Sequence, residues 1–87
     1  MKIEKLTEDI SKITVPGAVV TQHEVTVTDI AYHHLTCGRT TKEELLDFSF
    51  KFLLEREPNT SILSKFDISV ISQYFAEYEF EMLRILN

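Results

Sequence analysis

The stretch TKEELLDFSFKFLLERE, residues 41–57, decides how the rest of the chain must be arranged. Thr41 followed by Glu44 is a capping-box pattern at a helix start, and Pro58 cannot continue the helix at its end. The predicted helix has an apolar arc of roughly 240°, formed by Leu45, Leu46, Phe48, Phe50, Phe52, Leu53 and Leu54. Such a helix needs neighbours on at least two sides, from this chain or from a second one.

The length and composition predict one folded domain over residues 1–87. Apolar residues make up 44% of the chain and charged residues 26%, a balance that argues against disorder. The single cysteine excludes an intrachain disulfide, and no basic, apolar leader opens the chain, so we expect a cytoplasmic protein. The longest apolar runs are far shorter than the roughly 20 residues that cross a bilayer, and we expect no membrane segment.

The net charge of −5 argues against nucleic-acid binding. Phosphate binding needs clustered Lys and Arg, whereas the largest acidic concentration, Glu77, Glu79 and Glu81, would repel a nucleic-acid backbone. The segment from residue 62 to residue 74 resembles a helix-turn-helix. A recognition helix presents basic and amide side chains, whereas this segment offers Ser, Ser and Gln flanked by acids. We therefore expect no nucleic-acid partner.

Residues 1–40 predict mainly strands. Near the start, a spacing of three, four and three residues favours a short amphipathic helix on Ile3, Leu6, Ile10 and Ile13. Residues 13–15 fit a strand equally well, so this segment stays open between helix and strand. Apolar and polar residues alternate from Ala18 to Thr28, and a second β-rich run covers residues 31–36. With Asp29 as the turn residue, these two runs predict an antiparallel hairpin.

Residues 41–87 predict helices. A short helical turn is expected after Pro58, around Ile62, and Asp67 is a good N-cap for a final helix that continues to Leu86. Its apolar seam has heptad-like spacing, on Ile68, Ile71, Phe75, Tyr78, Met82 and Ile85. Phe80 and Leu83 lie off this seam, so either the helix bends near residues 76–77 or it has a second apolar surface.

The predicted fold class is therefore α+β. A small antiparallel hairpin or three-stranded sheet in the N-terminal half is packed by two main C-terminal helices, over residues 41–57 and 67–86. Because the strands precede the helices, separate layers are favoured over crossover connections.

The leading functional hypothesis is a non-catalytic protein-interaction module that binds itself or a partner protein. Apolar and aromatic side chains on the last predicted helix are the interface candidates: Tyr74, Tyr78, Phe80 and Leu83. A homodimer through this helix is one form of the hypothesis. A small sheet also has edges, so strand addition by a peptide is a second route.

The alternative is a small thiol- or metal-dependent activity centred on Cys37, with His34, His33 and His23 as further candidates. Arg39 and a following helix N-terminus would favour the Cys37 thiolate, and His34 is the nearest base. Adjacent His33 and His34 point to opposite faces of a strand, and no zinc-ligand spacing is present. We therefore expect neither a metal nor another cofactor, and no catalytic role.

Overall fold

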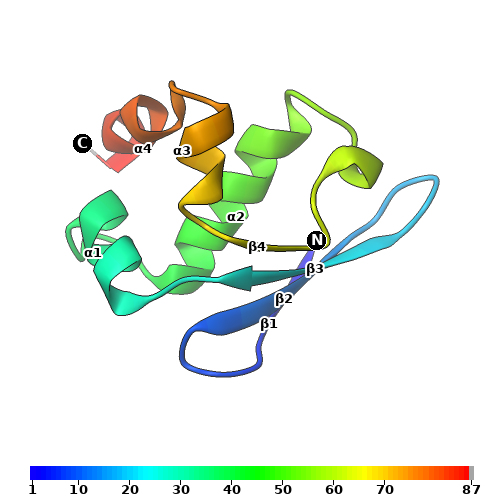
Figure 1. Cartoon of the computed structure of the whole chain (residues 1–87), viewed down its shortest axis with the longest axis horizontal. Coiled ribbons are helices and arrows are strands. Elements are labelled where there is room, and N and C mark those ends of the chain that lie inside the picture. Colours follow the sequence, from blue (N-terminus) through cyan, green and yellow to red (C-terminus); the bar gives the residue numbers. More distant parts are fainter. Residues whose placement is uncertain (87) are drawn as a thin grey trace.

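The structure is a computed structural model that describes residues 1–86, and it confirms the α+β fold (Figure 1). Four strands form one sheet in the order β1-β2-β3-β4, with bounds Lys2–Lys5, Ile10–Val15, Thr21–Thr26 and Lys65–Asp67. The α-helices are α1 (Asp29–Thr36), α2 (Lys42–Leu54), α3 (Val70–Tyr74) and α4 (Tyr78–Leu86). A 3-10 helix, η1 (Asn59–Ser61), follows Pro58, and the helical turn expected around Ile62 is wrong because the chain after η1 is extended and enters β4. The sheet has one strand more than the expected three-stranded form.

The N-terminal segment forms two strands, so its interpretation as a helix is wrong. β1 and β2 are antiparallel, with Ile3 opposite Ile13. The chain reverses at residues 6–9, where the Thr7 hydroxyl accepts hydrogen bonds from the amides of Asp9 and Ile10. Because this local turn brings the two β-rich stretches together, the helix-like spacing of their isoleucines never lies on one helix.

β3 confirms the alternation predicted after Ala18, with His23, Val25 and Val27 all buried on one face. Its hairpin partner is β2, and the expected hairpin with residues 31–36 is wrong because those residues form α1. Thr28 caps α1 by accepting from the Ala31 amide. The more buried positions of α1 have helical spacing, on Ala31, Tyr32, Leu35 and Thr36.

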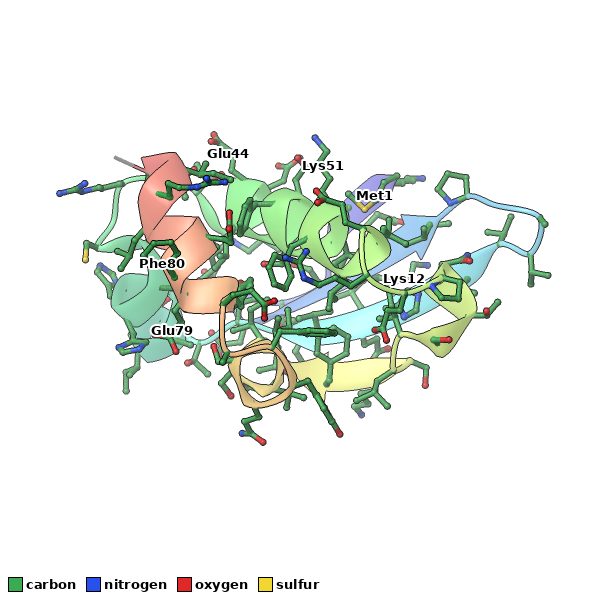
Figure 2. All side chains as sticks on the ribbon, turned by 90° about the horizontal axis from the view of Figure 1, so that it is seen from above. Met1, Lys12, Glu44, Lys51, Glu79 and Phe80 are labelled. Atoms are coloured by element: carbon green, nitrogen blue, oxygen red, sulfur yellow. The ribbon has the colours of Figure 1, made fainter. Side chains whose placement is uncertain are left out.

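α2 confirms the central helix, and Thr41 is its N-cap. The Thr41 hydroxyl accepts from the Glu44 amide, while the Glu44 carboxylate accepts from the Thr40 hydroxyl. In Figure 2, α2 lies across the sheet, and β4 lies at one margin of that sheet. Most of the apolar arc is covered by this one chain, with Leu45, Leu46, Phe50, Phe52 and Leu53 buried.

The expected final helix is divided, so its interpretation as one helix over residues 67–86 is wrong. Residues 65–67 form β4, parallel to β3, and α3 ends before the extended Phe75. This break agrees with the bend considered near residues 76–77. It allows both Phe75 and Tyr78 to contact Phe52, at ring-centroid distances of 5.7 and 5.3 Å. None of the helices in residues 1–86 has the length and apolar character that a membrane crossing requires.

Candidate functional site

The candidate site is an apolar groove of about 350 Å³ beside the edge strand β4. Its lining includes Leu53 of α2, Glu57 just after α2, and Phe66 of β4. Ser61 at the end of η1, with Ile62 and Leu63 after it, lines one wall, and α3 with Phe75 lines the other. Two of its apolar side chains are strongly exposed, Leu63 at 50% and Tyr74 at 71%. The groove therefore presents apolar surface to any chain that enters it.

The wall formed by residues 59–63 is fixed to the sheet by two side chains. The Asn59 amide donates to the Val19 carbonyl at 2.8 Å and to the Thr21 hydroxyl at 3.0 Å. His23, which is 2% exposed, bonds through Nδ1 to the Leu63 carbonyl at 2.7 Å. These bonds connect β3 to a segment about forty residues away in sequence, so the wall is held in place before any ligand arrives.

The hydrogen bonds of His23 define its tautomer. The Leu63 carbonyl can only accept, so His23 Nδ1 carries a proton. In the neutral ring Nε2 is then an acceptor, and it receives the Thr21 hydroxyl proton at 2.9 Å. Phe50 packs on this ring at a centroid distance of 5.4 Å. His23 thus acts as a buried structural link between β3 and the groove wall.

The opposite wall is anchored by buried side chains and by a local turn. Ile68 and Ile71 are 0% and 2% exposed. The Asp67 carboxylate accepts from both the amide and the hydroxyl of Ser69, which fixes the chain between β4 and α3. Both walls of the groove are therefore held by contacts with the rest of the fold.

The outer edge of β4 is open. Glu24 donates to the Ser64 carbonyl and Ile68 donates to the Thr26 carbonyl, so the even-numbered residues of this segment point their backbone groups towards β3. In a parallel ladder the alternate residues, Lys65 and Asp67, must point theirs away from β3. No further strand pairs with β4 in the described part of the chain, so these N–H and C=O groups face outward.

Glu57 is the one charged residue among the described residues that line the groove. Among residues 1–86, no salt bridge or side-chain hydrogen bond involves its carboxylate. An unpaired carboxylate in an apolar groove favours a cationic group on the ligand.

A second hollow, of about 410 Å³, contrasts with the groove because both of its lysines, Lys5 and Lys42, already lie beside carboxylates. Lys42 lies 2.9 Å from the Asp29 carboxylate and 3.6 Å from that of Asp9, and it donates to the Glu8 carbonyl. The hydrogen bond from Lys42 lowers the pKa of Asp29, and the same bond raises the pKa of Lys42. This cluster ties the turn between β1 and β2 to α1 and α2, which makes it a structural contact.

The four interface candidates from the sequence lie in three different places. Tyr74 lies at the rim of the groove, and Tyr78 is fully buried, so Tyr78 is unavailable to a partner. Phe80 and Leu83 are 67% and 52% exposed on α4, at the end of the molecule where α4 packs against α1 (Figures 1 and 2). The structure does not bring all four side chains together.

Tyr78 is held by a buried chain of hydroxyl groups. The Ser49 hydroxyl donates to the Leu45 carbonyl at 2.7 Å, so it accepts from the Tyr78 hydroxyl at 2.6 Å. Burial raises the pKa of Tyr78 to about 12, because the charged phenolate would lose its hydration. Tyr78 therefore anchors α4 to α2.

Each of the thiol and metal candidates from the sequence contacts a different part of the molecule. His33 bonds to the Asp29 carbonyl, and His34 lies 3.1 Å from the Glu79 carboxylate of α4, whereas His23 is buried beside the groove. Cys37 is exposed at the C-cap of α1 with a left-handed φ of 53°, at the end of a helix that the sequence did not predict. No group of three or more His, Cys, Asp or Glu side chains within residues 1–86 could hold a metal ion.

Sequence reasoning missed Leu63, Phe66 and Glu57 as site residues. Leu63 and Phe66 fall in or next to the short helical turn that the sequence predicts around Ile62, and Glu57 falls at the end of the predicted helix over residues 41–57. The one available signal was the short apolar run after Pro58 next to a good turn residue, which is too weak to identify an edge strand.

Comparison of the chain with protein-family models, with curated proteins and with solved structures found no match. A function for this protein must therefore follow from its own geometry.

Proposed function

We propose that this protein is a non-catalytic module that binds an apolar segment of a partner protein in the groove beside β4. The observation that carries this proposal is the preformed groove itself, with two fixed walls and exposed Leu63 and Tyr74 at its rim. Concave apolar surface of this size is typical of binding sites, whereas isolated exposed side chains are common on any protein.

Selection from a display library of random nine-residue peptides, against the immobilised full chain, tests this proposal. We expect enriched peptides that bind the wild type and lose at least about tenfold in affinity with Leu63→Asp, which places a charge at the apolar rim. Leu83→Asp is the matched control on α4 and should leave their affinity unchanged. The proposal fails if no peptide is enriched, or if Leu63→Asp has no more effect than Leu83→Asp.

Self-association through α4 is the second candidate function. It is favoured by Phe80 and Leu83, which lie three residues apart and are both exposed on α4. Light scattering coupled to size-exclusion chromatography, over a tenfold dilution, tests it. A dimer that Phe80→Ser/Leu83→Ser converts to folded monomers supports this candidate, and a monomer throughout overturns it.

A further inference from the structure

We infer that the occupant of the groove is an extended basic segment that pairs with β4 as a fifth strand of the sheet. In this arrangement an apolar side chain enters the groove, and a Lys or Arg side chain lies beside Glu57. The inference rests on the proposed function, because it specifies the partner's chemistry at the same groove.

The backbone argument comes from the direction of the free groups on β4. Lys65 and Asp67 present their N–H and C=O groups outward, at the margin of the sheet in Figure 2. At this open edge the groups can bond only to water, whereas an added strand about 4.8 Å from β4 supplies them with backbone partners. Strand addition is the recognised way in which a peptide uses such an edge.

The side-chain argument comes from the face of β4 that lines the groove. Phe66 lines the groove and packs on Phe50 at a ring-centroid distance of 6.1 Å, so this face of β4 is the one covered by α2. Side chains of an added strand alternate between the same two faces. Every second side chain of the peptide would therefore point into the groove, between the wall at Leu63 and the wall at Tyr74.

The charge argument comes from Glu57 and from the protein as a whole. Within residues 1–86, the Glu57 carboxylate has no ionic partner and is the only charge among the groove-lining residues. The full chain carries a net charge of −5. A basic peptide is therefore attracted over a distance and also gains a partner for its cation in the groove. A second copy of this chain would bring another anionic surface with its own unpaired Glu57, so a basic peptide is the more complementary occupant.

The probe for this inference is the peptide acetyl-Arg-Thr-Leu-Thr-Arg-amide, titrated into the full chain by calorimetry at low salt. Its Arg, Leu and Arg side chains share one face, so one Arg can reach Glu57 in either strand direction. We expect binding that Leu63→Ser weakens at least about tenfold and that Leu83→Ser leaves intact, because serine removes apolar surface without adding a carboxylate that would itself attract Arg. Replacing both Arg residues of the peptide by Glu should weaken its affinity for the wild type about tenfold. On the Glu57→Gln variant, the affinities of the Arg and Glu peptides should differ by less than about threefold.

N-methylated versions of the same peptide test strand pairing itself. In an antiparallel pair with Lys65 and Asp67, the two Thr amides donate to β4, whereas in a parallel pair the amides of the groove-facing residues do. Methylation of one set should therefore weaken binding about tenfold while methylation of the other set has little effect. The sensitive set also reports the direction of the added strand.

Several results would overturn this inference. The Arg peptide could fail to bind, its Glu counterpart could bind equally well, or the two methylation patterns could weaken binding equally. A protein dimer that the peptide dissociates would also overturn it, because a second copy would then be the occupant. Success of the library selection alongside any of these would leave the proposed function intact and reject strand addition by a basic segment. Failure of the selection would instead reject the groove as a binding site.

Discussion

The groove beside β4 and the outer face of α4 are both exposed and apolar, yet they differ in how their polar groups are satisfied. On α4, Glu79 lies 3.1 Å from His34, and Glu81 lies 2.8 Å from Arg84. Beside the groove, Glu57 has no ionic partner in residues 1–86, and the outer backbone groups of β4 are free of a neighbouring strand. The groove is also concave, whereas Phe80 and Leu83 project from a helix at the end of the molecule.

This difference teaches that exposed apolar surface alone does not define a binding site. A convex patch whose charges are already paired offers a ligand only apolar surface to bury, and the buried area alone is a poor guide to affinity. A concave site with unused hydrogen-bonding groups and an unpaired charge offers direction and specificity as well. Four predictions, in order of decreasing effect, test this contrast.

The largest expected effect is on the wall of the groove. Ile71→Ala removes a side chain that is 2% exposed, and we expect the free energy of unfolding to fall by about 2–5 kcal/mol. Leu83→Ala on α4 is the matched control, since its side chain is 52% exposed and its loss should change stability by less than about 0.5 kcal/mol. Urea unfolding of both variants measures the difference, and equal destabilisation would contradict it.

The attachment of α4 to the core should depend on pH through Tyr78. The pKa of Tyr78 is about 12 in the folded protein and 10.0 unperturbed, so the unfolded state loses its phenolic proton first as pH rises. Stability from this group is complete below pH 10 and is lost towards pH 12, by on the order of 2 kcal/mol.

Urea unfolding between about pH 9 and about pH 12 measures this loss of stability. Tyr78→Phe has no proton to release at this position, so its stability should fall less steeply over the same range. Parallel curves for wild type and variant would show that Tyr78 ionises equally in both states.

The fixed position of the groove wall should depend on His23. His23→Leu keeps a buried side chain but removes the donor to the Leu63 carbonyl, and we expect a loss of about 1–2 kcal/mol in the free energy of unfolding. Gln22→Leu, at the exposed neighbouring position, is the control. Amide exchange near residue 63 should also become faster in His23→Leu. Wild-type exchange in that variant would show that the wall is held by other contacts.

The smallest effect is expected on the outer face of α4. Phe80→Ser/Leu83→Ser replaces two exposed side chains, and the free energy of unfolding should change by less than about 1 kcal/mol. Peptides selected for the groove should bind this variant as they bind the wild type. A loss of groove binding in the folded double variant would show that the two surfaces act as one site.

Part of the fold could be predicted from local sequence alone. Thr41 and Pro58 bracket α2 closely, and the alternation around His23 and Val25 is that of β3. The last helix was predicted as one element, but the bend near residues 76–77, one of the two alternatives considered for it, lies close to the break between α3 and α4. Residues 31–36 were predicted as a strand because the capping of α1 by Thr28 and its packing on α4 are not visible in a period-two pattern.

The site was harder to predict than the fold because its parts are distant in sequence. Tyr74 was identified from its apolar and aromatic character, but Tyr78, assigned to the same interface, is buried against Ser49. The groove requires Leu63, Glu57 and β4 to meet, and β4 is only three residues long. A strand of this length has no pattern of its own, because pairing with β3 creates it.

The sequence by itself determined an acidic α+β domain built around one helix that had to be buried on most of its surface. Its charge balance, its helix caps and its apolar spacing are local properties, and they depend on neighbouring residues only. Tertiary structure alone decided that the apolar arc of α2 is covered within one chain and that an edge strand and an unpaired carboxylate meet beside a groove. Those outcomes depend on contacts such as that between His23 and Leu63, forty residues apart, which no local pattern encodes.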